Sequence, residues 1–319
     1  MNRRIRTALL ASCLLGLFSN PLHADGLSQY NVVWNSPSAS ALESMPCGGG
    51  DVGMNVWVED GNLLIYLSRS GTFDELNTFP KLGRIRVSVS PNVLDDPDTF
   101  RQELRLEEGE VEIRSRKGSE EVTLRVWTDV FRPMVHIDLE GNRQFTTYAT
   151  YENWRSEPRR LEEGEKESCR TYKGAPVTAV MQPDTLGFDG NGIVFRHRNQ
   201  GETAFEAVKE QLWNPIEGLV YGGRMSGDRM VPCGTTNGQY ASTPFRGWQL
   251  KSAAPRNKHH IQVALHTARD VTDREWAEAV ARLETDNAGR EKQRKKESLR
   301  WWKDFWDRSY IRVNPDRPD

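Results

Sequence analysis

Apolar and polar residues alternate with a period of two along most of the chain, from about residue 25 to residue 269. A strand with one buried face shows this alternation, because successive side chains point to opposite sides of a sheet. A slip of one residue would expose each apolar set to water, so every segment specifies one buried face. The sets are Ile85/Val87/Val89, Val111/Ile113, Val122/Leu124/Val126, Val135/Ile137/Leu139 and Ile261/Val263/Leu265.

Turn-forming residues fall between these segments and tolerate the positive φ that hairpins need. No fixed-period repeat is present, which argues against a propeller or a solenoid. The pattern predicts a mainly β fold, a large antiparallel two-sheet β-supersandwich over residues 25–269. The predicted turns are Asp60-Gly61, Glu108-Gly109, Gly141-Asn142 and Asp189 to Gly192.

The period changes to that of a helix after residue 270. Thr272 and Glu275 have the spacing of a capping box, and an apolar stripe at helical spacing follows. We expect a second helix from about Asn287 to Ser309, whose basic stretch Arg290 to Lys296 faces solvent. Residues 270–319 are therefore predicted to be a helical linker with a short disordered tail. The first stripe is Trp276, Ala279, Val280 and Leu283.

Three of the ten tryptophans lie within six residues of this second helix, at Trp301, Trp302 and Trp306. Leu299 and Phe305 extend them into one apolar stripe. Burial of one such side chain is worth roughly 1.5–3 kcal/mol, so the stripe needs a partner surface. We expect the rest of the chain, a helical catalytic barrel or another protein surface to pack on Trp302 and Trp306.

The first residues are typical of an export signal, because three arginines precede an apolar run from Ala8 to Phe18. Residues 1–24 are predicted to be a signal peptide, and the protein to be periplasmic or secreted. A lipoprotein leader with Cys13 as the lipid-bearing residue is the alternative, although apolar residues continue beyond Cys13. No later stretch approaches the ~20 apolar residues of a membrane span, so none is expected.

Without the three leader arginines, the chain keeps 40 basic and 45 acidic residues, a net charge of −5. This balance offers no surface for nucleic acid. Cys47, Cys169 and Cys233 allow at most one disulfide, and the sequence does not select the pair. The adjacent His259 and His260 are expected to point to opposite faces of a strand. No metal site and no cofactor are predicted.

A glycine-rich loop leads into a hairpin at Ser44 to Glu75. It is not a phosphate loop, because it lacks Gly-Lys-Ser/Thr and is followed by a strand. Further short motifs follow it along the chain, at Lys81 to Arg86, Arg125 to Asp129, Glu152 to Arg155, His197 to Asn199 and Trp301 to Ser309. Within the loop and hairpin, the motifs are Met45 to Gly53 and Asn55 to Glu59.

Together, these motifs resemble the exported bacterial domain of unknown function 5703. The chain is also similar, more distantly, to the N-terminal β-sandwich that precedes an (α/α)6 barrel in glycoside hydrolases of families 95 and 65. This resemblance implies that loops of the β domain line a sugar site beside the barrel, and that the catalytic carboxylates lie on the barrel.

The chain departs from this family pattern at three positions. Such proteins usually carry Asn at the position of Gly49, Asp at that of Gly71 and Trp at that of Phe73. Two hydrogen-bonding side chains and one stacking ring are therefore lost or reduced in this chain. Glycosidic cleavage needs two carboxylates on opposite sides of the bond. No acidic pair here lies in a recognisable motif, so no catalytic residue is assigned.

The candidate substrate-binding residues are Gly49, Asp51, Phe73 and Trp154. Asp51 follows the glycine loop, where it can reach a ligand or accept backbone amides as a turn cap, and the cap is favoured. Trp154 is the best candidate for a ring on a rim, whereas Trp57 and Trp127 are expected to pack in the core.

His136 is out of phase with its apolar neighbours and is expected to be exposed. His197 is expected to be a structural histidine or, less favourably, a contact for a neighbouring domain. Residues Arg155 to Lys173 are rich in charge and are expected to form an exposed connection within the β domain.

Three functional hypotheses follow. The chain is the non-catalytic N-terminal part of a glycoside hydrolase-like protein that supports a barrel absent from this chain, a free-standing periplasmic carbohydrate-binding module, or a glycan hydrolase with an unrecognised site. The tryptophan stripe favours the first hypothesis, because it needs a partner.

Overall fold

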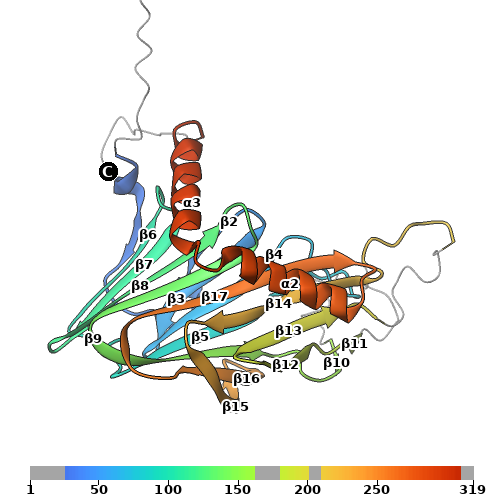
Figure 1. The fold of residues 1–319 in the computed structure, drawn as a ribbon, viewed down its shortest axis with the longest axis horizontal. Helices are drawn as coiled ribbons and strands as arrows, with labels where there is room; N and C mark the ends of the chain where they lie inside the picture. The colour runs from blue at the N-terminus through green and yellow to red at the C-terminus, as the bar shows by residue number, and fades with distance from the viewer. Residues whose placement is uncertain (1–25, 162–179, 201–209, 310–319) are drawn as a thin grey trace, which may run out of the picture.

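The computed structural model describes residues 26–161, 180–200 and 210–309. The predicted signal peptide, Cys13, Cys169 and the end of the tail lie outside these residues. Two antiparallel sheets face one another and share one long strand, and two α-helices follow at the C-terminal end (Figure 1). The mainly β two-sheet prediction is therefore confirmed.

Sheet A is the larger of the two. Its strands pair in the order β1-β6-β7-β8-β9-β17-β14-β13-β12, and every neighbouring pair is antiparallel. The bounds are β1 (Val32–Trp34), β6 (Thr99–Arg105), β7 (Glu110–Lys117), β8 (Glu120–Asp129), β9 (Met134–Asn153), β12 (Thr185–Asp189), β13 (Gly192–Arg198), β14 (Leu219–Gly227) and β17 (Arg256–Arg269).

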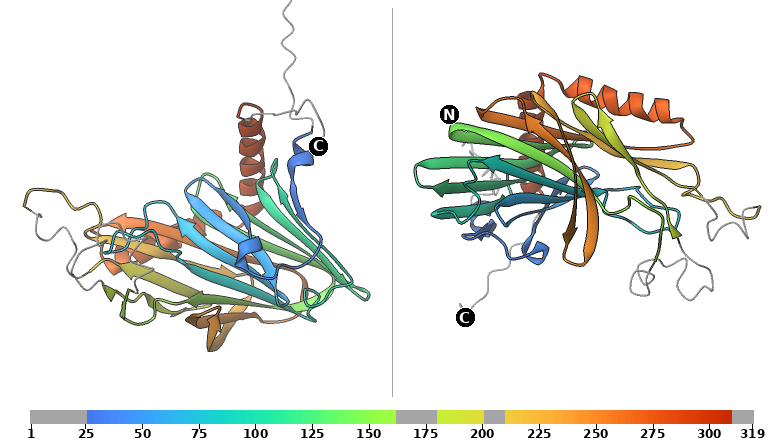
Figure 2. Two further views of the ribbon diagram at one scale, coloured as in Figure 1. Left: turned by 180° about the vertical axis from the view of Figure 1, so that it is seen from behind. Right: turned by 90° about the horizontal axis from the view of Figure 1, so that it is seen from below.

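Sheet B pairs in the order β2-β3-β4-β5-β9-β16-β15. Its hairpin β15–β16 projects away from the two facing sheets (Figure 2). Two 3-10 turns, η1 (Leu27–Tyr30) and η2 (Ala41–Glu43), and the short pair β10 (Arg159–Arg160) and β11 (Val180–Met181) complete the β domain. The bounds in sheet B are β2 (Met45–Gly49), β3 (Val52–Glu59), β4 (Asn62–Arg69), β5 (Gly83–Ser90), β15 (Met230–Tyr240) and β16 (Thr243–Ser252).

Strand β9 passes from one sheet to the other. Its first half pairs with β8 and β17, and its second half pairs with β5 and β16. The turn predicted at Gly141-Asn142 is therefore wrong, because these residues lie inside β9 at the crossing point. Exposed polar residues interrupt the alternation there, and a sequence pattern does not distinguish such a crossing from a turn. The turns at Asp60-Gly61 and Glu108-Gly109 are confirmed.

The main core lies between the two sheets. All five predicted apolar sets are buried in it. Trp57 and Trp127 are also buried, as predicted, but they lie outside this core. Trp57 instead contacts Tyr66 and Tyr240, and Trp127 stacks on His136. Both rings lie on the outer faces of their sheets, where the polar residues of each strand were expected.

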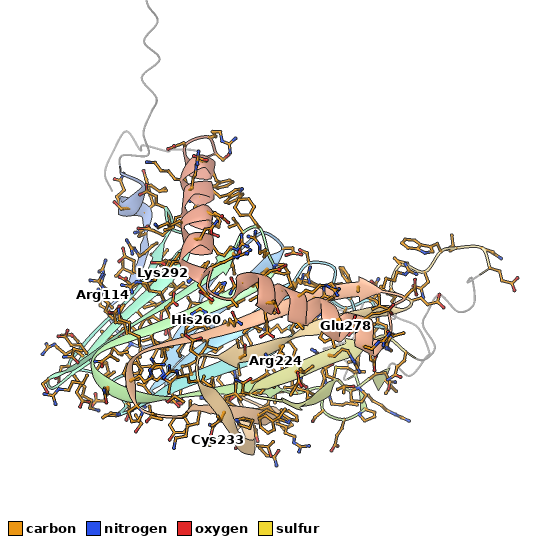
Figure 3. The ribbon with its side chains drawn as sticks, in the orientation of Figure 1. Arg114, Arg224, Cys233, His260, Glu278 and Lys292 are labelled. Atoms are coloured by element: carbon orange, nitrogen blue, oxygen red, sulfur yellow. The ribbon has the colours of Figure 1, made fainter. Side chains whose placement is uncertain are left out.

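Helix α2 (Asp273–Asn287) covers the outer face of sheet A. Its predicted capping box is present, with reciprocal hydrogen bonds between Thr272 and Glu275. Trp276 and Val280 are buried against Met134, Val220 and Ala264 of the sheet. Arg224, labelled beneath the helix in Figure 3, donates hydrogen bonds to both carboxylate oxygens of Glu284 at 2.9 and 2.8 Å.

Helix α3 (Glu291–Trp306) stands at a steep angle to α2 (Figure 1). The sequence predicts that its basic stretch, Arg290 to Lys296, faces solvent. The structure shows that part of this stretch is covered instead. Arg294 is buried, and the Lys295 ammonium lies 2.8 Å from Glu110 and 5.5 Å from the Trp127 ring centre. Glu110 of the sheet compensates the charge of Lys295, whereas Arg294 pairs with Glu297 of its own helix at 3.3 Å. The composition of the basic stretch does not reveal these partners.

Trp302 and Trp306 pack against the β6–β7 turn of the same chain. Trp306 Nε1 donates to the carbonyl of Leu106 at 2.6 Å. Trp302 lies over Gly109, where a Cβ atom would fall 2.0 Å from the indole nitrogen. Of the partners expected for these two rings, the rest of the chain is the one that the structure shows, and both rings remain half-buried.

We predict that Gly109→Ala displaces α3. Gly109 has φ +62°, and Gly118 has φ +60° with no atom within 4 Å of the position that a Cβ would take, so Gly118→Ala is a matched control. Both variants carry the backbone penalty of about 1 kcal/mol. The free energy of unfolding of Gly109→Ala should fall by a further ~1–3 kcal/mol, because the added methyl group overpacks against Trp302. Urea denaturation with acrylamide quenching of tryptophan fluorescence measures both effects, and equal losses would contradict the packing.

Candidate functional site

The β2–β3 turn carries two of the candidate residues. Gly49 is close-packed, since a Cβ atom there would lie 2.7 Å from Thr128 Oγ1 and 3.6 Å from Trp302. The Asp51 carboxylate accepts a hydrogen bond from Arg69 Nε at 3.0 Å. It is thus paired across the β3–β4 ladder with a guanidinium, whereas a backbone cap was favoured from the sequence. Its side chain remains 44% exposed.

Phe73 lies on the loop between β4 and β5, which begins beside Asp51. The amide of Ser70 donates to the Asp51 carbonyl at 2.8 Å. Phe73 is 38% exposed, and its ring centre lies 5.5 Å from that of Phe79. The fold therefore brings Gly49, Asp51 and Phe73 to one edge of the sandwich, through the end of β4.

Trp154 lies elsewhere, at the end of β9 on the outer face of sheet B. It is half-buried, and its ring meets that of Tyr66 edge-on with a centroid distance of 6.0 Å. The four candidates thus occupy two places on the surface rather than one.

Directly beneath the β4–β5 loop lies a buried charge network. Its centre is His197, whose Nδ1 lies 2.8 Å from Asp184 and whose Nε2 lies 2.8 Å from Glu75. Arg155 donates to both carboxylate oxygens of Asp184, at 3.0 and 2.6 Å, and Asn153 donates to the same carboxylate at 2.7 Å. We call Glu75, Asn153, Arg155, Asp184 and His197 the histidine network.

The network explains the protonation state of its members. Burial alone would lower the pKa of His197, but the hydrogen bonds and charges of Asp184 and Glu75 raise it to about 9. Burial acts against the charged form of Asp184, yet Arg155 and His197 hold its pKa below the usual value. A protonated His197 between two carboxylates is thus the stable arrangement at neutral pH.

The network is sealed from solvent. The side chains of Glu75 and Asp184 are each 2% exposed, and that of His197 is 0% exposed. A general acid or base must reach the proton that it transfers, and these groups are occupied by one another. The arrangement therefore joins chain segments, as expected of a structural histidine. It ties the β4–β5 loop, the end of β9 and the end of β13 into one unit.

Sequence reasoning misses most of this network. Glu152-Asn153-Trp154-Arg155 and His197-Arg198-Asn199 stand out as motifs, but nothing in the sequence places them together. Arg155 is expected in an exposed connection, whereas it is buried. Most of that connection, residues 162–179, lies outside the described residues. The available signal is a motif in which Asn and Arg flank a tryptophan.

A second polar cluster lies under α3, where His136 was expected to be exposed and is 0% exposed. Its ring stacks on Trp127 with centroids 4.1 Å apart, and Nδ1 lies 3.4 Å from His260. Burial lowers the pKa of His136 to about 3. His260 Nδ1 lies 2.8 Å from Asp138, and His259 points to the other face, where it meets the carbonyl of Phe145. Helix α3 and neighbouring rings cover this part of the outer face of sheet A, so His136 is buried although it lies at a polar position of its strand.

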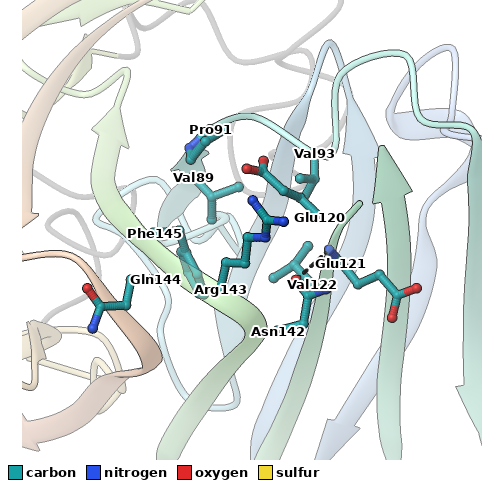
Figure 4. Close-up of a pocket in the computed structure, with 10 residues that line it drawn as sticks. All are labelled: Val89, Pro91, Val93, Glu120, Glu121, Val122, Asn142, Arg143, Gln144 and Phe145. Carbon is teal, nitrogen blue, oxygen red and sulfur yellow. Dashed lines mark hydrogen bonds between the residues drawn. The ribbon is translucent and has the colours of Figure 1, made fainter. Parts of the chain in front are cut away.

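Two hollows in the described part of the molecule differ in size and character. A pocket between the end of β5, the start of β8 and the middle of β9 holds about 20 Å³, the size of one water molecule, and is lined by Val89, Val93, Val122, Arg143 and Phe145 among others (Figure 4). A charged depression of about 350 Å³ lies beside β6 and β7, where Arg105 pairs with Glu108 and Glu110. Neither is an apolar pocket of ligand size.

Cys47 and Cys233 are free thiols in strands β2 and β15. Burial raises the pKa of Cys47 to about 12, which keeps it protonated. Within the described residues, no three His, Cys, Asp or Glu side chains are grouped to bind a metal ion. None of the helices there is both long and apolar enough to cross a membrane.

The profile of one protein family, described as "Domain of unknown function (DUF5703)", matches residues 33–311. The chain belongs to this family. The match begins in β1 and extends past the end of α3, so a DUF5703 domain includes both the sandwich and its two helices.

Among curated proteins, none matches this DUF5703 chain. Two solved structures are similar to it in fold. One is named "Putative kojibiose phosphorylase from human microbiome", with 9% identity, and the other is a bacterial glucoamylase complexed with acarbose, with 13% identity. Each has a TM-score of 0.44 and covers 86% of this chain. The chain spans only 38% of the length of either protein.

We predict that His197→Gln destabilises the protein in a pH-dependent way. The pKa of His197 is higher in the folded state than the unfolded value of 6.5, so its contribution is complete below pH 6.5 and is lost as pH rises through 9. The variant should be less stable by up to about 3 kcal/mol at pH 6, and the difference should shrink towards pH 10.

Urea denaturation from pH 6 to pH 10 measures this difference. His266→Gln is the control, because burial lowers the pKa of His266 and gives no such loss at high pH. A difference between wild type and His197→Gln that stays constant with pH would contradict the charged state of the network.

Proposed function

We propose that this protein is an exported, non-catalytic β domain of a glycoside hydrolase-like protein, whose role is to hold a helical catalytic domain. The observation that carries the proposal is the second face of α3. Trp301 and Phe305 stack in parallel there, with centroids 5.4 Å apart and planes at 11°. Both rings are half-buried, and within the described residues they stack on each other and meet neighbouring rings of α3 edge-on.

An exposed ring on the sandwich lies in a turn that contacts α3. Phe131, in the β8–β9 turn, is 57% exposed. The turn abuts α3, because the Val130 amide donates to Ser298 Oγ at 3.3 Å and Arg132 lies 3.7 Å from Glu297. We call Phe131, Trp301 and Phe305 the aromatic edge. Aromatic residues exposed together in this way are typical of a protein interface.

The positions of the carboxylates support the non-catalytic role. Glycoside cleavage needs two carboxylates that reach the bond from opposite sides. Glu75 and Asp184 are the carboxylates that the fold gathers around one histidine, and both are enclosed. Asp51, the exposed candidate, forms a salt bridge with Arg69.

We predict that the purified chain does not turn over glycosides. Aryl glycosides and α-linked disaccharides, with and without inorganic phosphate, should be cleaved no faster than in a buffer blank. Product formation followed by chromatography is the measurement. Turnover that a single Asp or Glu substitution abolishes would refute the non-catalytic role.

We also predict that the aromatic edge contacts a helical glycan-active domain in the producing cell. A photo-crosslinking phenylalanine analogue at Trp301 or Phe131 should form an adduct that mass spectrometry identifies as that class of protein. The same analogue at Phe188, which is 39% exposed on β12, is the control and should not capture it. Equal capture from all three positions, or none from the aromatic edge, would contradict the interface.

A further inference from the structure

The outer face of sheet B carries a row of aromatic rings beside a cluster of cations. Trp57, Tyr66 and Trp154 follow one another, with centroids 4.9 Å apart for the first pair and 6.0 Å for the second. The Lys81 ammonium lies 4.2 Å from the centre of the Tyr66 ring. Trp57 is fully buried, whereas Trp154 is half-buried and Lys81 is exposed. At its open end the row thus carries the half-buried Trp154 and, over the neighbouring Tyr66 ring, the exposed Lys81.

The histidine network fixes both of these residues from below. Trp154 lies between Asn153 and Arg155, whose side chains both bind Asp184. Arg155 Nη1 also donates to the backbone carbonyl of Lys81 at 2.6 Å. One buried guanidinium therefore joins the strand that carries the ring to the loop that carries the ammonium. The backbone that carries the ring and the backbone that carries the ammonium are thus held in place before a ligand binds, which reduces the conformational entropy lost on binding.

This face has an excess of positive charge. Arg84 and Arg86 both pair with Glu152, each at 2.5 Å, so two guanidinium groups share one carboxylate. The Arg84 guanidinium lies 3.9 Å from the centre of the Tyr240 ring, which covers it. Tyr240 in turn donates to Glu59 at 2.8 Å, and Trp57 Nε1 donates to the same oxygen.

Lys81 differs from these cations. No carboxylate of the described residues lies within 4 Å of its ammonium. An exposed ammonium with only an aromatic neighbour can take an anionic ligand without first breaking an ion pair. The ligand that complements this face is therefore both anionic and suited to a ring surface.

We propose that Trp154, Lys81 and Tyr66 form a binding site for an acidic oligosaccharide, one that contains a uronic acid. The C–H groups on one face of a pyranose are apolar and match the exposed indole surface of Trp154. The carboxylate on C5 of the sugar then reaches the Lys81 ammonium, in a charge-assisted hydrogen bond. Binding here involves no covalent step.

The site is independent of the aromatic edge on α3. It lies on the outer face of sheet B, and it uses no residue of the proposed interface with a helical domain. Failure of one proposal leaves the other standing, because their variants and their measurements differ.

Isothermal titration calorimetry on the whole chain tests the site. The probes are trimers of galacturonate, glucuronate and mannuronate, and the same trimers after reduction of their carboxyl groups. At least one acidic trimer should bind, about tenfold or more tightly than its reduced form, and binding should weaken as salt increases. Trp154→Ala should weaken that binding about tenfold or more.

Lys81→Met separates the charge from the stacking. It should lower the affinity for the acidic trimer about tenfold and leave the affinity for the reduced trimer unchanged. Lys81→Arg should restore most of the affinity for the acidic trimer. Trp154→Phe keeps a ring and should retain part of the binding, which distinguishes stacking from a folding defect. Trp213→Ala is the matched control, because Trp213 is 75% exposed and lies against Arg269 on a different loop.

Several results would overturn the proposal. One is that no acidic trimer binds at millimolar concentration. Another is that Trp213→Ala and Trp154→Ala lower the affinity equally. The third is that Lys81→Met lowers the affinity for acidic and reduced trimers by the same factor. Tetraglutamate is the further anionic probe. Binding of this peptide as tightly as the best trimer would show that the face recognises charge without recognising a sugar.

Discussion

Strand β9 is the element on which both sheets depend, because one continuous backbone supplies a central strand to each. Its residues 134–141 lie between β8 and β17, and residues 146–153 lie between β5 and β16. A shift of register in one half would therefore carry into the other half. Side chains alternate along a strand, so the shift would turn apolar residues such as Ile137 and Tyr151 out of the core.

The end of β9 also positions the polar groups of the molecule. Asn153 and Arg155 leave the strand pointing to Asp184, while Trp154 between them points outward. The same three residues thus build the histidine network inside and an aromatic position outside. Buried charges are stable only when they are paired and hydrogen-bonded, and here each charge has a partner. This pairing and the buried side chains of Leu76 and Leu82 together fix the loop that carries Phe73 and Lys81.

The two helices distribute their contacts unequally. Helix α2 buries an apolar stripe on sheet A, as its sequence indicates. Helix α3 has rings on more than one side, and Trp302 and Trp306 contact the β6–β7 turn. Trp301 and Phe305 stack on one another, and the same helix contacts the turn that carries the exposed Phe131 through Ser298 and Val130. The proposed interface and the proposed saccharide site therefore lie on different elements of the same rigid domain.

The sequence by itself determined the mainly β class, the buried face of each strand and the capped helix α2. These properties follow from periodicity and local hydrogen bonding, which involve neighbours in the chain. It also identified short motifs, including the tryptophan flanked by Asn153 and Arg155. Only the tertiary structure decided that β9 crosses at Gly141 instead of turning, that His136 is buried under α3, and that Glu75, Asp184 and His197 meet. Each of these depends on a segment distant in the sequence: β17 and α3 cover His136, and three separate segments bring the carboxylates to the histidine. A local pattern records which face of a strand is polar, but what covers that face is decided by packing.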